Sequence, residues 1–239
     1  MRYAPLPFFN DRQTAIDVLM FHCSAHVASE MWNALQKQQL SCHYIIDTDG
    51  TVIQVVPEDK RAWHGGLGSW REIKEDINSH SIGIELSSLS LGQTPYSSKQ
   101  IESLIQLSQD IISRYHIKPQ NIIGHSDSAP TRKADPGKTF PWQTLAQHNI
   151  GLWYNLKDAV NAPTDNLKTL LSDIGYDVST PTNYQASQYA FARHFVPYLV
   201  ETIENVYYLV NNVFPPDIDF SENETLIQTA QAVYMRFQA

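Results

Sequence analysis

Cysteine is scarce in this sequence. Among 239 residues there are two, Cys23 and Cys42, which are too few for a disulfide framework and are not spaced as a C-x-x-C pair. They fit two free, partly buried thiols, or one disulfide between neighbouring strands. The sequence therefore excludes a small disulfide-stapled scaffold, and its length allows a sizeable hydrophobic core instead.

Basic clusters and long apolar stretches are also missing. The net charge is −8 and no run of Lys or Arg stands out, so we expect no nucleic-acid partner. No apolar stretch approaches the roughly 20 residues that span a bilayer, so we expect no transmembrane segment. The N-terminal segment lacks the apolar region and cleavage site of a signal peptide. The chain is then either cytoplasmic or lacks an export signal that was removed.

Strand and helix patterns alternate over residues 1–155. The expected strands are Ile16 to His22, two within the segment CHYIIDTDGTVIQVV, Ser81 to Ser87, and Asn121 to His125. The Asp-Gly pair in the second segment is typical of a hairpin turn, so the sheet cannot be purely parallel. The expected helices are Ser29 to Gln39, Ser97 to His116 and Pro141 to His148, and the expected loops are Asp59 to Trp70 and Ser126 to Phe140. This order predicts an α/β fold with a mixed β-sheet flanked by helices.

The composition changes near the segment NLKDAVNAPTD, residues 155–165. Beyond it the pattern is helical only, over Asn166 to Gly175, Thr182 to Phe195 and Glu222 to Phe237. We therefore predict two domains: residues 1–155, which carry the sheet, and residues 165–239, a small all-α domain.

The densest reactive chemistry lies in the segment GHSDSAPTRKADPG, residues 124–137. His125 ends an expected strand, Asp135 lies in the following loop, and His22 ends an earlier strand. These three residues could form a catalytic zinc site, which usually has three protein ligands and an open fourth position. A histidine that ends a strand is also common as a structural residue, so the spacing alone leaves both interpretations open.

Five ordered segments carry a resemblance to a known family. FHCSA, CHYIIDTDG, KRAWHGG, SIGIELSS and GHSDSAPTRKADPG together resemble the N-acetylmuramoyl-L-alanine amidase type 2 family, over roughly Val18 to Trp142. The chain is most similar to the AmiD type, in which a small helical peptidoglycan-binding-like domain follows the catalytic domain. The resemblance implies one Zn²⁺ per chain, a peptidoglycan or muropeptide substrate, and hydrolysis of the amide between muramic acid and L-alanine.

The resemblance also assigns roles to individual residues. His22, His125 and Asp135 match the zinc ligands. Glu85 matches the catalytic glutamate, and Lys133 matches a lysine beside the metal. Glu85 could take the proton of the attacking water while Lys133 stabilises the oxyanion, or Lys133 could move protons while Glu85 orients the water. Cys23 follows the first ligand where relatives often have Tyr, and strand alternation places it on the opposite face.

Aromatic residues and glycines between the motifs could form the walls of a substrate groove. The residues that we expect there are Tyr44, Trp63, His64, Gly65 and Trp70. The same residues also fit a glycine-rich loop above core tryptophans, so the pattern leaves both interpretations open. Glycine allows a ligand to approach the backbone closely, and aromatic faces suit sugar rings.

Two other functions use the same scaffold or the same metal chemistry. A non-catalytic peptidoglycan-recognition protein typically lacks one or more zinc ligands, and a zinc peptidase would cut within the peptide stem. The complete set of site residues favours the amidase. Since peptidoglycan lies outside the cytoplasm, the resemblance favours a periplasmic or outer-membrane-associated location over a cytoplasmic one.

Overall fold

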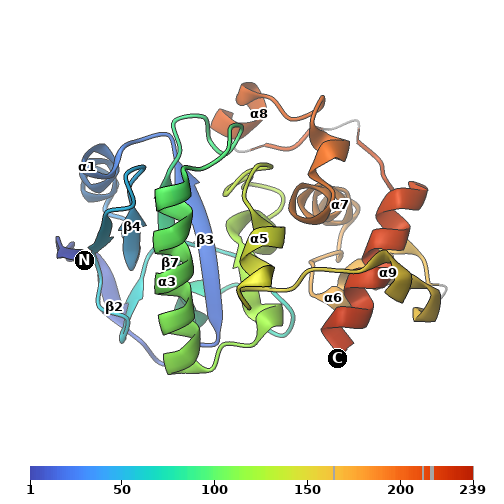
Figure 1. Ribbon diagram of the computed structural model, residues 1–239, viewed down its shortest axis with the longest axis horizontal. Helices are drawn as coiled ribbons and strands as arrows, with labels where there is room; N and C mark the ends of the chain where they lie inside the picture. The colour runs from blue at the N-terminus through green and yellow to red at the C-terminus, as the bar shows by residue number, and fades with distance from the viewer. Residues whose placement is uncertain (164, 212, 216–217, 239) are drawn as a thin grey trace.

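The computed structural model of the protein describes residues 1–163, 165–211, 213–215 and 218–238 (Figure 1). Within these residues the main sheet has six strands in the order β1-β5-β4-β7-β3-β8. Their bounds are Arg2–Tyr3 (β1), Val18–Ser24 (β3), Tyr44–Ile46 (β4), Val52–Gln54 (β5), Ser81–Ser87 (β7) and Ile122–Gly124 (β8). A separate antiparallel pair joins β2, Phe9–Asp11, to β6, Lys60–Ala62.

The sheet is mixed, as predicted. Strands β4, β7, β3 and β8 run parallel, whereas β5 pairs antiparallel with β4. The β4–β5 hairpin turns at Gly50, which has a φ of 85° and donates its N–H to the carbonyl of Asp47 at 2.9 Å. The expected loop from Asp59 to Trp70 is wrong at its start, because Lys60–Ala62 forms β6 against an N-terminal strand that the sequence did not reveal.

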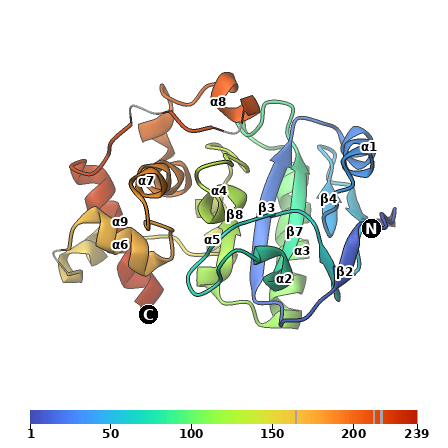
Figure 2. The ribbon, with the colours of Figure 1, turned by 180° about the vertical axis from the view of Figure 1, so that it is seen from behind.

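The two faces of the sheet have different covers. On one face, Leu19 and Phe21 of β3 pack with Leu104 and Ile111 of helix α3, Ser98–Tyr115. On the other face, Val18 and Met20 join a second core. Because side chains alternate along a strand, His22 belongs to the face opposite α3. Figure 1 shows α3 in front of the sheet, and Figure 2 shows the other face, crossed by the loop that carries α2, Ile77–His80.

Helix α3 begins where the sequence predicts, but its cap differs from a full capping box. The Ser97 hydroxyl oxygen accepts a hydrogen bond from the Gln100 N–H at 3.2 Å. The Gln100 amide does not return to Ser97. It donates to the carbonyls of Ile46 and Ser87 at 2.9 and 3.0 Å. The helix start is thus tied to the ends of β4 and β7.

The remaining helices of the sheet-bearing part are short. Helix α1 covers Ala28–Gln38 and α5 covers Trp142–Gln147, both close to their predicted bounds. Helix α4, His125–Ser128, lies in the segment expected to be a loop. His125 therefore begins a helix directly after β8 rather than ending a strand. A 3₁₀ turn, Pro119–Asn121, precedes β8.

The C-terminal part is helical, and its three predicted helices are present. They are α6, Leu167–Ile174, α7, Pro181–Phe195, and α9, Glu224–Gln238. A further helix, α8, Val206–Asn211, and the 3₁₀ turns Leu156–Asn161 and Pro197–Val200 were not predicted. Figure 1 shows α7 lying beyond α5, away from the N-terminal edge of the sheet. Buried residues of α6, α7 and α9 form one core with Val18, Met20 and Ile123 of the sheet.

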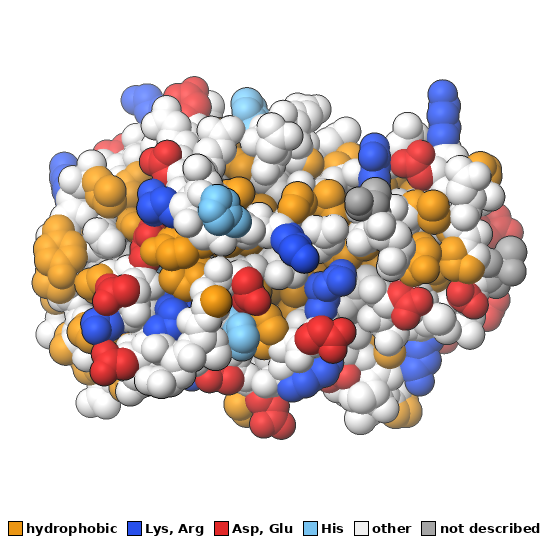
Figure 3. All heavy atoms as spheres, turned by 90° about the horizontal axis from the view of Figure 1, so that it is seen from below, with side chains coloured by type: hydrophobic (Ala, Val, Ile, Leu, Met, Phe, Trp, Pro, Cys, Tyr) orange, Lys and Arg blue, Asp and Glu red, His pale blue; other side chains and the backbone are white. Residues whose placement is uncertain are grey.

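The surface carries charges of both signs (Figure 3), and the two cysteines lie inside the protein. Figure 3 views the molecule from below, and on that face Lys and Arg side chains are interspersed with Asp and Glu. None of the helices in the described part of the chain is long and apolar enough to cross a membrane. Cys23 and Cys42 are both free and buried.

Candidate active site

The parallel register of the central strands brings the predicted catalytic residues together. His22 of β3 is the direct partner of Glu85 in β7. On the other side of β3, Phe21 pairs with Gly124, so His125 follows immediately beyond the end of β8. The carboxyl ends of parallel strands meet at one edge of a sheet, and functional groups gather there because each strand continues into a loop or helix.

His22, His125 and Asp135 form a compact group on this edge. The His22 Nδ1 atom lies 3.0 Å from His125 Nδ1 and 3.1 Å from Asp135 Oδ2, and His125 Nδ1 lies 3.1 Å from the same oxygen. Both histidines are almost fully buried. Two imidazole nitrogens and one carboxylate oxygen fit the donor set of a catalytic zinc site.

The far nitrogen of each imidazole also has a partner. His125 Nε2 lies 2.9 Å from the carbonyl oxygen of Gly65. His22 Nε2 lies 2.9 Å from Nδ1 of His64. Burial is the main cause that lowers the pKa of His22 to about 4, and the nearby His125 is the second. Burial likewise holds the pKa of His64 well below its usual range. Both rings are therefore neutral at physiological pH, as binding of a metal by His22 would require.

Glu85 and Lys133 lie beside this group. Burial, reinforced by the charge of Asp135, raises the pKa of Glu85 to about 8, while Lys133 acts in the opposite direction. The Glu85 Oε2 atom is buried and has no hydrogen-bond partner among the described residues. A buried carboxylate oxygen without a partner is unusual in a structural residue and typical of a reactive one.

These residues line one cavity of about 460 Å³. Four of its lining residues are His125, Asp135, Glu85 and Lys133. The lining also includes Trp63 and His64 and the apolar residues Leu91, Leu209 and Val210. The volume lies within the range of small-ligand sites. Leu209 and Val210 belong to α8, so the C-terminal part supplies some of the lining. No periodicity or motif in the sequence indicates this contribution.

Three of the residues expected in the groove lie elsewhere. Trp70 is 2% exposed, stacks edge-on against Tyr176 and donates from its indole nitrogen to the carbonyl of Gln120, away from the cavity. Tyr44 is buried and donates its hydroxyl to Glu58 at 2.7 Å. Gly65 does not line the cavity and instead contacts His125 through its carbonyl. Trp70 and Tyr44 are corrected to core residues, because buried aromatics and groove aromatics share one sequence pattern.

A second buried carboxylate lies behind the site and was missed from the sequence. Asp127 of α4 accepts hydrogen bonds from the Gly124 N–H at 2.8 Å and the Tyr176 hydroxyl at 2.7 Å. Its Oδ2 atom lies 2.8 Å from Nδ1 of His194 in α7. Tyr176 and His194 thus connect the C-terminal helices to the turn that carries His125. Tyr176 and His194 lie 49 and 67 residues from Asp127 in the sequence, so no local pattern predicts these two contacts.

Comparison with known proteins identifies the family. A family model described as N-acetylmuramoyl-L-alanine amidase matches residues 12–138. The amidase AmiD of Escherichia coli is 38% identical over 77% of this chain and 76% of its own length. The chain belongs to the N-acetylmuramoyl-L-alanine amidase family. This confirms the predicted family, the enzyme class, and the reaction in which the amide between N-acetylmuramic acid and L-alanine is hydrolysed.

Other relatives agree with this assignment. The 1,6-anhydro-N-acetylmuramyl-L-alanine amidase AmpD of Enterobacter cloacae is 48% identical to this chain, over 43% of this chain and 54% of its own length. Among solved structures, E. coli AmiD in complex with anhydro-N-acetylmuramic acid-L-Ala-D-γ-Glu-L-Lys has a TM-score of 0.74 at 33% identity, covering 95% of this chain and 93% of that one. AmpDh3 of Pseudomonas aeruginosa has a TM-score of 0.76 at 26% identity, covering 94% and 93%. These matches confirm the predicted fold class.

Proposed function

We propose that this amidase binds one Zn²⁺ through His22, His125 and Asp135 and cleaves the bond between N-acetylmuramic acid, or its 1,6-anhydro form, and L-alanine of the stem peptide. The observation that carries the proposal is the convergence of three metal-ligand atoms, from His22, His125 and Asp135, at a cavity lined by His125, Asp135, Glu85 and Lys133. AmpD is named for 1,6-anhydro-N-acetylmuramyl-L-alanine, and the AmiD structure holds an anhydro-N-acetylmuramic acid peptide, which supports the second form of the sugar.

The donor set itself fits zinc. His22 Nδ1, His125 Nδ1 and Asp135 Oδ2 approach one another closely, and a cation would relieve the crowding of their lone pairs. Two histidines and one carboxylate would match the three protein ligands that a catalytic zinc site usually has. When bound, zinc supplies a Lewis acid and lowers the pKa of water to about 7.

Glu85 is suited to act as the general base. It faces the cavity from the strand position next to His22, and its raised pKa places proton transfer close to neutral pH. Glu85 takes a proton from the attacking water and then delivers it to the nitrogen of the leaving L-alanine. Lys133, on the same cavity, stabilises the oxygen of the scissile carbonyl as negative charge develops on it.

The cavity walls suggest how the substrate is held. Trp63 offers an aromatic surface, and Leu91, Leu209 and Val210 offer apolar contacts. We assign the sugar to the aromatic side, because ring faces pack well on aromatic side chains. Trp63 is fixed by its indole N–H, which donates to Asn10 at 2.6 Å.

The first test combines metal analysis with product analysis. Elemental analysis of the purified protein should give about one zinc per chain. Purified muropeptide should be hydrolysed, with the products identified by mass spectrometry before and after chelation. We expect a peptide that begins at L-alanine, and its release should stop on chelation and resume when zinc is added back.

The alternatives give different results. Binding of muropeptide without cleavage would replace the enzyme by a recognition protein. Cleavage within the stem that leaves the sugar–alanine bond intact would replace the amidase by a peptidase. Chelator-resistant amidase activity would contradict the zinc site while leaving the reaction in place.

We also propose that residues 165–239 form a peptidoglycan-binding-like domain and that the enzyme acts in the cell envelope. The lining of the cavity by Leu209 and Val210 supports contact between this part and the substrate. The full chain should sediment with insoluble cell wall, and a Leu209→Ser/Val210→Ser variant should release muropeptides more slowly. Equal sedimentation with wall and with cellulose would contradict binding to peptidoglycan.

A further inference from the structure

The dipeptide His64–Gly65 contacts both histidines of the metal group. The His64 ring lies against His22, and the Gly65 carbonyl lies against His125, at 2.9 Å in each case. Neither residue would be a ligand. Histidines that bind metals usually donate their second ring N–H to a partner that fixes the ring and its tautomer. One short segment is therefore in position to orient two ligands.

The proton positions in the His64 chain follow from its far end. The Ser81 hydroxyl donates to the carbonyl of Ile77 at 2.7 Å, so its only proton is used. The Ser81 oxygen must then accept from His64 Nε2, which lies 3.3 Å away. A neutral imidazole carries one proton. His64 Nδ1 is consequently an acceptor, and it receives the Nε2–H of His22.

The result at His22 is a defined tautomer. With its proton on Nε2, His22 presents an unprotonated Nδ1 toward His125 and Asp135. The opposite tautomer would place a proton between the ligand atoms. On the other side, the Gly65 carbonyl can only accept, so a neutral His125 donates from Nε2 and also presents an unprotonated Nδ1.

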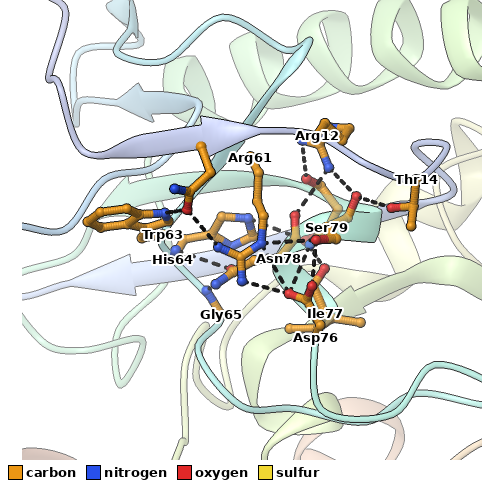
Figure 4. Close-up of polar contacts among 12 residues, drawn as sticks. Arg12, Thr14, Arg61, Trp63, His64, Gly65, Asp76, Ile77, Asn78 and Ser79 are labelled. Carbon is orange, nitrogen blue, oxygen red and sulfur yellow. Dashed lines mark hydrogen bonds and ion pairs between the residues drawn. The ribbon is translucent and has the colours of Figure 1, made fainter.

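The surroundings hold the dipeptide in place. The Asn78 side-chain oxygen accepts from the backbone N–H groups of Gly65 and His64 at 2.7 and 3.3 Å. Figure 4 shows Asn78 beside both residues. Gly83 of β7 leaves room for the His64 ring, since a Cβ at that position would lie 2.5 Å from the ring atoms. Asn78 and Gly83 are thus explained by the same arrangement.

We propose that Ser81 and the His64–Gly65 dipeptide are positioning elements that fix the tautomers of His22 and His125 for zinc binding. This inference rests on the proposed zinc site. It assigns Gly65 to metal positioning rather than to the substrate groove, and it adds a positioning role to His64, which also lines the cavity. Second-partner residues of this kind typically change metal affinity by about 10- to 100-fold.

The test measures zinc affinity by competition with a chromophoric chelator in the full-length protein. His64→Leu should raise the zinc dissociation constant about 10- to 100-fold. His64→Asn should recover part of the loss, because its amide oxygen can accept from His22 Nε2–H. Ser81→Ala should give an intermediate loss. Ser108→Ala removes another buried hydroxyl, in α3, and should bind zinc as the wild type does.

A second readout reports the tautomers directly. Long-range ¹H–¹⁵N spectra of the zinc-loaded wild type should show His22 and His64 protonated on Nε2. In Ser81→Ala, the His64 signals should change to a mixture of tautomers. Thermal unfolding with excess chelator checks that each variant is folded. If His64→Leu does not fold, Ser81→Ala and His64→Asn still test the inference.

The outcomes separate this inference from the proposed function. If the wild type does not bind zinc, the zinc site is wrong and the inference falls with it. If the wild type binds zinc and His64→Leu binds it equally well, the zinc site stands and the positioning role is wrong. A wild-type spectrum with His22 protonated on Nδ1 would also overturn the inference.

Discussion

Two buried histidine–carboxylate clusters lie close together in this protein and differ in one respect. In the Asp135 cluster, the Nδ1 atoms of His22 and His125 crowd one carboxylate oxygen at 3.1 Å. In the Asp127 cluster, the carboxylate accepts from Gly124 and Tyr176 and contacts His194. With the histidine tautomers proposed above, the first cluster brings three acceptors together, whereas the second pairs acceptors with donors.

The difference distinguishes a cluster suited to bind a metal from a cluster that stabilises the fold. Buried acceptors that face one another raise the free energy of the folded state unless a cation binds between them. A carboxylate whose oxygens accept hydrogen bonds from protein groups needs no such cation. Within the described part of the chain, the group with metal-ligand geometry is the one that contains Asp135. Asp127 instead fastens the first turn of α4, which carries His125, to the C-terminal helices. The same residue types are therefore suited to metal binding in one cluster and to stability in the other.

The largest expected effect is loss of the metal from the Asp135 cluster. Asp135→Ala should lower amidase activity to background and remove most of the bound zinc, because two histidines alone hold the ion weakly. Elemental analysis and muropeptide hydrolysis measure the two effects. Asp110→Ala, an exposed substitution on α3, is the control and should change neither. Full zinc content in Asp135→Ala would remove Asp135 from the ligand set.

The second effect concerns the general base beside that cluster. Glu85→Gln should reduce the turnover number by about 10²- to 10⁴-fold, because the amide cannot accept the proton of the attacking water. Zinc content should remain at the wild-type level, since Glu85 lies outside the ligand group. Glu30→Gln, on the exposed face of α1, is the matched control. A Glu85→Gln enzyme that works at the parent rate would exclude the assigned role.

The third effect lies in the Asp127 cluster and is one of stability. Asp127→Ala should lower the free energy of unfolding by about 3–5 kcal/mol, because it leaves the donors of Tyr176, His194 and Gly124 buried without an acceptor. Urea denaturation followed by circular dichroism measures the change. Zinc content should be lowered less than in Asp135→Ala. If Asp127→Ala loses all zinc but keeps its stability, the distinction between the two clusters is wrong.

The smallest expected effect is a loss of stability on removing one hydrogen-bond donor, the Tyr176 hydroxyl, from the Asp127 cluster. Tyr176→Phe should lower the free energy of unfolding by about 1.5–3 kcal/mol, the usual contribution of a hydrogen bond to a charged group. Turnover below the unfolding transition should remain unchanged, because Tyr176 does not line the cavity. Tyr3→Phe, at a residue that is 63% exposed, should leave stability unchanged. An activity loss without a stability loss would instead connect Tyr176 to the chemistry.

The sequence was sufficient for the family, the mixed sheet and most element bounds. The long helix before His116 and the strand Ser81–Ser87 have strong local patterns, and the structure places them within one residue of the prediction. The short strands β1, β2 and β6 were missed, because two or three residues carry no measurable periodicity. Helix α8 was missed for a similar reason.

Local pattern could not decide which aromatic residues face the cavity. Trp63 and Trp70 lie in the same glycine-rich segment, yet Trp63 lines the cavity and Trp70 packs against Tyr176 in the core. The difference depends on helices that follow more than a hundred residues later in the chain. Glycine-rich segments have no period that assigns a face, so only long-range packing makes the choice.

The sequence by itself determined which chemical groups are available: two histidines and an aspartate suited to zinc, with a glutamate and a lysine nearby in the motifs. The tertiary structure decided how they work together. Strand register placed Glu85 beside His22, and the contacts of His64 and Gly65 are the basis of the proposed tautomers of the two histidines. Residue type fixes what a side chain can donate or accept, but protonation and orientation depend on neighbours that only the folded chain supplies.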